Sequence, residues 1–244
     1  MSIVAIIPAR YASTRLPGKP LLAETGMPLI RHVVEAAGRS KRIDRVIVAT
    51  DDDRIAEAVR AFGGEVAMTR EDHPSGTDRV AEVAEGLVGV ELVVNLQGDE
   101  PEASGASLDD LVDLMRRDPG AAMGTLATPI IEESIYLDPS CVKVVIAAGR
   151  ALYFSRSPIP FHRDGVADDH YGYLHIGMYA YRPDFLKRLA AMPTSPLERA
   201  EKLEQLRVLE AGYPIAIGVV EEPSVGIDTP EDYRRFVSRW RSRR

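Results

Sequence analysis

Three cations lie within ten residues of one another, just after the first strand-like run of the sequence. The apolar run Ile3–Ile7 leads into a segment that carries Arg10, Arg15 and Lys19, at spacings of five and four residues. Small residues separate these cations: Ala9, Ala12, Ser13 and Gly18. Small residues let backbone N–H groups approach a phosphate, and fixed cations neutralise its charge. The segment therefore predicts a phosphate site, and three cations match a triphosphate better than a monophosphate.

Two common phosphate-binding patterns are missing from the sequence. It contains neither the GxxxxGK[ST] pattern of P-loop proteins nor the GxGxxG pattern of dinucleotide-binding proteins. The cationic segment instead leaves the carboxyl end of a buried strand, where open α/β sheets bind their ligands. An ordinary basic surface loop is the alternative interpretation.

A second strand-like run ends in acidic residues. The sequence LVVNLQGDEP, residues 92–101, delivers Gln97, Asp99 and Glu100 to the carboxyl end of its strand. Magnesium binds a triphosphate through one or two protein carboxylates while it keeps several waters. Gly98 permits a turn in which a larger side chain would block a nucleotide. Asp99 is therefore a candidate magnesium ligand, with an acidic turn as the alternative and a metal contact of Glu100 left open.

Strand-like runs alternate with helical patterns through most of the chain, which predicts a mainly parallel, three-layer α/β sheet with right-handed crossovers. The predicted buried strands are Ile3–Ile7, Arg45–Ala49, Val66–Thr69, Leu92–Leu96 and Met123–Thr128. The predicted helices between them are Pro28–Ala37, Arg54–Phe62, Asp78–Leu87 and Leu108–Arg116.

From Pro129 to Arg182 the pattern changes to strands with little helix, which predicts an antiparallel insertion. The predicted strands there are Val142–Ala147, Ala151–Ser155 and His175–Tyr181. Cap signals at Ser195 and Thr229 start two later helices. The first is expected to run from Leu197 to Ala211 with a core stripe of Ala200, Leu203 and Leu206, and the arginine-rich end of the second is expected to be solvated and frayed.

Composition excludes several classes of function. The formal net charge is −7, from 30 Lys and Arg against 37 Asp and Glu, so a nucleic-acid partner is not expected. A single cysteine, Cys141, excludes an internal disulfide and a cysteine metal cluster. The sequence has no apolar run of the ~18–20 residues that a membrane span needs. A strand-like run already begins at Ile3, so we expect no cleavable leader, no membrane partner and a cytoplasmic location.

Nine motifs in sequence order resemble those of the Kdo cytidylyltransferases, where Kdo is 3-deoxy-D-manno-octulosonate, within the CMP-sugar-acid synthetases. They are PARYASTRLPGKPL (8–21), IVATDD (47–52), MTREDHPSGTDR (68–79), VNLQGDEP (94–101), VKVV (142–145), ALYFSRSPIP (151–160), HIGMYAYR (175–182), SPLERAEKLEQLRVLEAG (195–212) and GIDTPEDY (226–233). The related guanylyl- and uridylyltransferases carry a Gly-Gly pair where this chain has Ala9 and Arg10. The resemblance implies a Rossmann-like nucleotide-diphospho-sugar transferase fold, with residues 1–244 as one domain and 129–182 as a β-rich insertion for substrate and dimer contacts.

The resemblance also implies a set of site residues. The residues implied to bind the nucleotide are Ala9, Arg10, Ser13, Arg15, Lys19, Arg70, Ser75, Gly76, Thr77, Arg79 and Gly98. Those implied to bind the sugar acid are Gln97, Arg156, His175, Tyr179, Glu204 and Gln205. Those implied to hold Mg²⁺ are Asp99 and Asp228, and the expected catalytic set is Arg10, Lys19, Asp99 and Asp228.

Some of these assignments have a structural alternative. Asp228 precedes the helix cap at Thr229, so it can instead belong to that cap. Arg79 can reach either a triphosphate oxygen or a base carbonyl, and Asp78 is expected to cap the helix that begins there. His73 is expected on a surface loop.

The resemblance implies the reaction CTP + Kdo → CMP-Kdo + diphosphate, for lipopolysaccharide assembly, with Mg²⁺ as cofactor and a homodimer as the assembly. A related acid, such as 8-amino-Kdo or a phosphonate acid, is the first alternative. It stays open because the segment Phe161–Leu174 is short and Leu174 stands where a basic residue is common. A catalytically inactive nucleotide sensor is the second alternative, but it predicts the loss of a metal carboxylate or of the lysine, and Lys19, Asp99 and Asp228 are all present.

Overall fold

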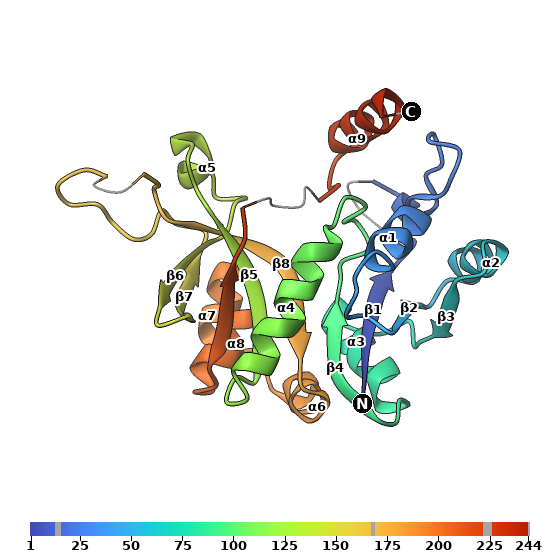
Figure 1. The fold of residues 1–244 in the computed structure, drawn as a ribbon, viewed down its shortest axis with the longest axis horizontal. Helices are drawn as coiled ribbons and strands as arrows, with labels where there is room; N and C mark the ends of the chain where they lie inside the picture. The colour runs from blue at the N-terminus through green and yellow to red at the C-terminus, as the bar shows by residue number, and fades with distance from the viewer. Residues whose placement is uncertain (13–15, 167–168, 222–225, 244) are drawn as a thin grey trace. The chain divides into compact units, whose positions relative to one another are not determined.

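Parallel strands and helices alternate through the first part of the chain, as the sequence predicts (Figure 1). The computed structural model describes residues 1–12, 16–166, 169–221 and 226–243. They divide into two compact units, one formed by Met1–Asp109 with Ser224–Arg244 and the other by Asp110–Pro223. Each unit is described by itself.

The first unit is a parallel sheet with helices between its strands. Its strands are β1 (Ser2–Ala9), β2 (Arg45–Thr50), β3 (Glu65–Met68) and β4 (Val90–Asn95). Its helices are the 3-10 turn η1 (Lys19–Leu21), α1 (Leu29–Ala37), α2 (Asp53–Ala61), α3 (Gly76–Glu85) and α9 (Pro230–Ser242), while α4 (Gly105–Arg117) continues into the second unit.

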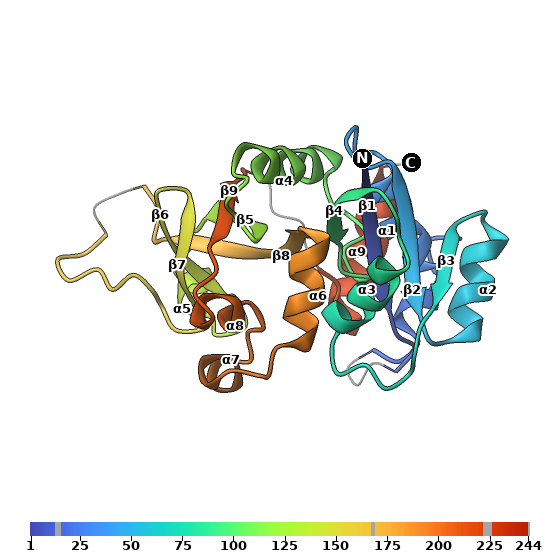
Figure 2. The same ribbon diagram turned by 90° about the horizontal axis from the view of Figure 1, so that it is seen from below.

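Strand β1 lies at the centre of this sheet because every residue from Ile3 to Ile7 is apolar and buried. The spatial order is β3-β2-β1-β4, and all three pairings are parallel (Figure 2). Ile6 pairs with Ile47 of β2 on one side and with Asn95 of β4 on the other. The strand order therefore reverses beside β1, and such a switch point is where the carboxyl ends of parallel strands leave room for a ligand.

The prediction that residues 66–69 form a buried strand is wrong in one respect. Strand β3 forms, but it lies at the edge of the sheet, and none of its residues is fully buried. Val66 and Ala67 have a neighbouring strand on one side only, since β3 pairs with β2 alone in the first unit.

Helix α9 is fixed to the first unit by a small apolar cluster. Tyr233, Phe236 and Val237 of this helix pack with Leu29 and Ile227. Its C-terminal end is not simply solvated and frayed, which corrects the prediction. Arg239 forms an ion pair with Glu102 at 2.5 Å, and Arg243 contacts the same carboxylate at 3.1 Å.

The second unit contains a curled, mixed sheet. Its strands are β5 (Met123–Pro129), β6 (Lys143–Ala147), β7 (Arg150–Ser155), β8 (Tyr173–Tyr181) and β9 (Ile215–Val219), and its helices are α5 (Glu133–Leu137), α6 (Pro183–Ala191), α7 (Pro196–Glu201) and α8 (Gln205–Glu210). The strand order is β8-β5-β9-β7-β6, and β6 also pairs with β8. Through this last pairing the sheet closes on β8, the first strand in that order. The pairs β5–β8, β6–β7 and β6–β8 are antiparallel, as predicted for the segment 129–182.

The single helix predicted from Leu197 to Ala211 is wrong. Figure 2 shows two short helices, α7 and α8, in its place. The chain turns at Lys202, whose φ of 55° lies in the left-handed region. Leu203 and Leu206 are buried as expected, but Ala200 is exposed because the turn rotates α7 out of register with α8.

Candidate active site

A lysine and two aspartates from distant parts of the first unit meet at the switch point beside β1. The Lys19 ammonium donates to Asp99 Oδ2 at 2.7 Å and to the Ile227 carbonyl at 2.8 Å. It also lies 3.8 Å from Asp228 Oδ1. The Lys19 side chain is 14% exposed, and that of Asp228 is 53% exposed. The prediction that Asp99 and Asp228 lie close together in space is therefore confirmed.

The local sequence explains how each of these three side chains is held. Lys19 opens the turn η1 immediately after Gly18, whose φ of 66° is easiest for glycine. Asp99 is tied to the C-terminal segment because the Ile227 N–H donates to its carbonyl at 2.9 Å. Asp228 stands one residue before the α9 cap.

Asp228 does not supply the cap of α9. Thr229 accepts a hydrogen bond from the Asp232 N–H, and the Asp232 carboxylate accepts from the Thr229 N–H at 2.9 Å, which together form a capping box. The Asp228 backbone N–H also donates to Asp232, at 3.2 Å. The Asp228 carboxylate lies 3.8 Å from Lys19, and its role in metal binding stays a prediction.

Gly98 is required by the protein's own backbone. A Cβ atom at this position would lie 2.8 Å from the Pro8 carbonyl oxygen of β1. The turn after β4 therefore passes against the end of β1, and this close approach places Gln97 and Asp99 beside the cationic segment. The glycine is explained by this contact as well as by the room for a nucleotide that the sequence suggested.

The two carboxylates and the lysine suit a divalent cation bound to a polyphosphate. Carboxylate oxygens are the ligands that Mg²⁺ takes in proteins, and it keeps most of its waters. Within the described ranges, no group of three or more His, Cys, Asp or Glu side chains is arranged as a metal site. Two protein carboxylates are sufficient for a magnesium that a triphosphate also coordinates.

Arg10 and the segment after β3 are joined by a hydrogen bond. Arg10 Nη2 donates to the His73 carbonyl at 2.8 Å. The His73 ring is buried against the Glu82 carboxylate, so the prediction of an exposed surface-loop histidine is wrong. Arg70 is 68% exposed, and its guanidinium lies 3.7 Å from Glu82 and 3.8 Å from Asp72.

Arg79 lies beneath this segment with no exposed surface. Its guanidinium contacts Asp51 at 3.3 Å and donates to the Thr69 hydroxyl. Burial lowers the pKa of this guanidinium, and the Asp51 carboxylate opposes the change. Arg79 is thus placed to hold the ends of β2 and β3 together, and a direct contact with a nucleotide stays a prediction.

Ser75, rather than Asp78, caps helix α3, which corrects the sequence prediction. The Ser75 hydroxyl accepts from the Asp78 N–H at 3.2 Å and donates to the Asp78 carboxylate at 2.6 Å. Gly76 begins the helix, and Thr77 is buried with its hydroxyl 3.5 Å from Asn95 Nδ2. The helix therefore starts two residues earlier than predicted.

Two further predicted residues lie in the first unit, Ala9 for the nucleotide and Gln97 for the sugar acid. Ala9 is buried and pairs with Thr50 of β2. Gln97 Nε2 donates to Asn95 Oδ1 at 3.3 Å. Ser13 and Arg15 lie outside the described residues, so their predicted roles in nucleotide binding stay predictions.

In the second unit, His175 and Tyr179 lie on one face of β8, as their spacing predicts. Their ring centroids are 5.4 Å apart, and His175 Nε2 lies 3.1 Å from the Thr125 hydroxyl. Burial lowers the pKa of His175 to about 3, so the ring is neutral at neutral pH. Burial, with the charge of Glu204, raises the pKa of Tyr179 well above its ordinary value.

Arg156 is anchored to the C-terminal end of α7. Its Nε donates to the Glu201 carbonyl at 2.8 Å, and its Nη1 donates to the Pro139 carbonyl at 3.1 Å. The Glu201 carboxylate in turn accepts from the Arg156 N–H at 2.9 Å. Glu204 directly precedes α8, and Gln205 is buried at its first position.

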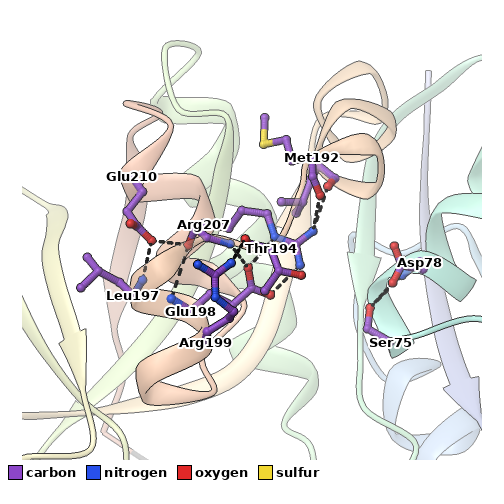
Figure 3. A network of polar contacts seen from close by, with 11 residues as sticks. Ser75, Asp78, Met192, Thr194, Leu197, Glu198, Arg199, Arg207 and Glu210 are labelled. Carbon is purple, nitrogen blue, oxygen red and sulfur yellow. Dashed lines mark hydrogen bonds and ion pairs between the residues drawn. The ribbon is translucent and has the colours of Figure 1, made fainter.

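A polar network fixes α7 and α8 (Figure 3). Arg207 forms two hydrogen bonds with the Glu198 carboxylate, at 2.7 and 2.5 Å, and donates to the Met192 carbonyl at 3.1 Å. Glu210 accepts from the Leu197 N–H at 3.1 Å. Because these contacts link the end of α6 to both short helices, they set the position of Gln205 relative to β8.

Comparison with known proteins gives the family. The family model described as Cytidylyltransferase matches residues 4–219. The 3-deoxy-manno-octulosonate cytidylyltransferase of Syntrophotalea carbinolica is 51% identical over 96% of this chain and 97% of its own length. The enzyme of that name from Geobacter sulfurreducens is 48% identical over 98% and 99%.

This chain belongs to the 3-deoxy-manno-octulosonate cytidylyltransferase family. A solved structure of a CMP:2-keto-3-deoxy-manno-octonic acid synthetase in complex with CTP supports the same conclusion. It is 43% identical to this chain and covers all of both chains with a TM-score of 0.95. The mixed α/β fold of a nucleotidyltransferase is thereby established for this member of the family.

Three residues that the sequence analysis did not select contact predicted site residues or fix the helices near them. Glu82 contacts His73 and the Arg70 N–H, Glu201 holds Arg156, and Arg207 holds Glu198. All three are charged residues at helical positions, where a solvated surface is the ordinary expectation. The spacing of Glu198 and Arg207, nine residues apart, gives no local sign of their pairing, since neighbours on one helix face are three or four residues apart.

Proposed function

We propose that this protein transfers the cytidylyl group of CTP to the anomeric hydroxyl of Kdo, which yields CMP-Kdo and diphosphate for lipopolysaccharide assembly. The observation that carries the proposal is the meeting of Lys19, Asp99 and Asp228 in a chain 51% identical to a 3-deoxy-manno-octulosonate cytidylyltransferase. The sheet on which they meet suits a Rossmann-like assignment, with a nucleotide at the switch point.

The nucleotide is assigned to the first unit. Lys19 and Arg10 place positive charge where β1 ends, and such charge stabilises a departing diphosphate in phosphoryl-transfer sites. Arg70 is exposed and lies 3.7 Å from Glu82 of α3, and Ser75 caps the start of that helix. Helix N-termini favour anions because their first N–H groups point toward the ligand.

We further propose Mg²⁺ as cofactor, held by Asp99 and Asp228. Both carboxylates contact a single ammonium, so the site already balances their charge with a cation. When bound, Mg²⁺ would polarise the α-phosphate toward attack. The two aspartates would hold the Mg²⁺, and the Lys19 ammonium beside them could pair with a phosphate oxygen.

The sugar acid is assigned to residues of the second unit, and the role of Gln97, in the first unit, stays a prediction. Arg156 can pair with the carboxylate of the acid, since a guanidinium matches the geometry of a carboxylate with two parallel hydrogen bonds. The neutral His175 ring and the Tyr179 hydroxyl, which keeps its proton, offer hydrogen bonds to sugar hydroxyls. A neutral His175 with so low a pKa is unsuited to accept a proton at neutral pH, so we assign it no role as a base.

We also propose a homodimer formed through residues 129–182, in the cytoplasm. Large apolar side chains are exposed on this segment, among them Ile131, Leu152 and Phe161, the last at 86%. Exposed apolar side chains gathered on one segment are typical of a contact surface. Within the described ranges, no helix is long and apolar enough to cross a membrane.

Isothermal titration of the protein with CTP and with GTP, followed by analysis of the product by mass spectrometry, tests the nucleotide assignment. We expect CTP to bind more tightly and the CTP reaction with Kdo to give CMP-Kdo. Tighter GTP binding, or a product without cytidine, would contradict the proposal.

A further inference from the structure

Glu82 on helix α3 contacts both ends of the segment that carries Arg70 and His73. Its Oε2 accepts from the Arg70 N–H at 3.2 Å and is hydrogen-bonded to the His73 ring. Burial alone would raise the pKa of Glu82, but the hydrogen bonds from His73 and from the Arg70 N–H outweigh burial and lower it. A charged carboxylate therefore closes residues 70–73 into a fixed loop.

The same loop holds Arg10 of the cationic segment. The His73 carbonyl accepts from Arg10 Nη2 at 2.8 Å, while the His73 ring is buried against Glu82. A continuous chain of contacts thus runs from Glu82 through His73 to Arg10. Two arginines assigned to the nucleotide depend on this loop, Arg10 through its side chain and Arg70 through its backbone.

Helix α3 also holds the residue that precedes the loop. Arg79, three residues before Glu82 and hence on the same side of the helix, donates to the Thr69 hydroxyl. Its guanidinium lies 3.3 Å from Asp51, at the end of β2. Arg79 and Glu82 therefore contact the chain on both sides of the point where it leaves β3.

We propose that Glu82 is a positioning residue for CTP: by holding residues 70–73 it sets the orientation of Arg10 and Arg70 toward the nucleotide. This inference rests on the assignment of CTP to the first unit. A direct contact between Glu82 and CTP is disfavoured, because a carboxylate repels a triphosphate. The exposed Arg70 guanidinium is not fixed by burial, but it lies 3.7 Å from Glu82, so this carboxylate contacts both the backbone and the side chain of Arg70.

The test compares three substitutions by titration with CTP in the absence of the acid. Glu82→Ala removes both hydrogen bonds of the loop and should weaken CTP binding roughly tenfold, the effect of about 1.4 kcal/mol. Glu82→Gln keeps an acceptor for the Arg70 N–H and the His73 ring and should bind within about twofold of the parent. Glu85→Ala changes the same residue type on the exposed last turn of α3 and should have no effect.

A purely structural role would change other properties instead. We expect the KM for Kdo of Glu82→Ala to stay close to that of Glu85→Ala. The urea midpoint of unfolding should fall because the buried His73 ring loses this partner, and a purely structural role would give that fall without a loss of CTP affinity. If Glu82→Ala does not fold, Glu82→Asp serves in its place, because it keeps the charge but shortens the reach, and it should weaken CTP binding severalfold. CTP binding equal to that of Glu85→Ala would overturn the proposal.

A double-mutant cycle with His73 tests the route of the effect. Because Glu82 acts in part through the His73 ring, Glu82→Ala should cost less CTP affinity in a His73→Ala background than in the parent. Fully additive losses would overturn the proposed chain of contacts. Should the parent bind GTP and not CTP, the proposed function fails, and the same comparison is made with GTP, whose triphosphate needs the same two arginines.

Discussion

Lys19 and Asp99 form an ion pair of 2.7 Å across a sequence separation of 80 residues. The same ammonium lies 3.8 Å from Asp228, so one lysine screens the repulsion between two carboxylates. A divalent cation that bound these carboxylates would compete with the lysine for them, whereas a triphosphate would attract the lysine away. We therefore expect the binding of metal to be linked to the binding of nucleotide.

We expect Lys19→Met to bind a divalent cation more tightly than the parent when no nucleotide is present. The substitution removes the ammonium that pairs with the two carboxylates but keeps most of the apolar part of the lysine side chain. Titration with Mn²⁺, followed by the electron paramagnetic resonance signal of the free ion, measures the affinity. Lys41→Met, at an exposed position of the same unit, is the control, and equal affinities for the two variants would contradict the expectation.

The same variant should use CTP poorly. Loss of one charge-stabilising donor costs about 2.7–4 kcal/mol of transition-state stabilisation. We therefore expect kcat/KM for CTP to fall by roughly 10²–10³-fold in Lys19→Met, while Lys41→Met keeps the parent value. Steady-state measurement of diphosphate release at saturating Kdo provides the comparison.

Asp99→Asn and Asp228→Asn should each remove most of the turnover while the fold survives. The metal supplies several kcal/mol of charge stabilisation, so we expect kcat to fall at least roughly 10²-fold. Circular dichroism checks the fold, and Asp110→Asn, an exposed aspartate of α4, is the matched control. If Asp228→Asn turns over at the parent rate, the two-carboxylate site is wrong.

Arg156→Lys should raise the KM for Kdo and leave CTP binding unchanged. Lysine keeps the charge but cannot reproduce the planar fork that a guanidinium offers to a carboxylate. A hydrogen bond to a charged group contributes about 1.5–3 kcal/mol, so we expect a rise of at least roughly tenfold. Arg188→Lys, on the exposed side of α6, is the control. If Arg156→Lys weakened CTP binding and used Kdo normally, the assignment of Arg156 to Kdo would be wrong.

The low pKa of His175 predicts a loss of stability in acid. The ordinary histidine pKa of about 6.5 applies to the unfolded chain, and burial lowers the pKa to about 3 in the folded protein. Between these two values only the unfolded chain takes up the proton, so stability is fully present above pH 6.5 and is lost as the pH falls toward 3.

His175→Gln should remove this contribution. The contribution of His175 changes the free energy of unfolding by at most about 1.4 kcal/mol per pH unit, the value for one proton. Urea unfolding of the parent and of His175→Gln at a series of pH values from 7 to 4 measures it. The two profiles should converge as the pH falls, and parallel profiles would show that His175 takes up its proton in the folded protein as well.

The central strands and the helix starts could be predicted because their signals are local. Ile3–Ile7 and Leu92–Leu96 are apolar on both faces, which is typical of buried parallel strands, and both strands form within two residues of the predicted bounds. Ser195 and Thr229 are each followed by a proline and then an acidic residue, and both form capping boxes.

The errors have their causes in long-range contacts. The break at Lys202 depends on Arg207, which reaches back nine residues to Glu198, and a continuous helix satisfies the local pattern equally well. The burial of His73 depends on Glu82, on the following helix. No local pattern of residues 69–75 indicates that partner.

The site was predictable in part. Lys19 and Asp99 could be named from a cation and a carboxylate that follow strand ends, whereas the metal role of Asp228 came from the family resemblance. Arg79 was likewise assigned to the nucleotide by the resemblance, but its burial against Asp51 follows from the packing of α3 and could not be read from the sequence.

The release of diphosphate from CTP, measured with a panel of acids in the presence of Mg²⁺, tests the central claim most directly. The panel contains Kdo, 8-amino-Kdo and a phosphonate acid, with no acid as the blank. We predict rapid release that depends on Kdo, slower release with the other acids, and release near the blank level when Asp99→Asn replaces the parent. Release that does not depend on Kdo, or that is fastest with another acid, would contradict the assignment of this protein as the enzyme that activates Kdo.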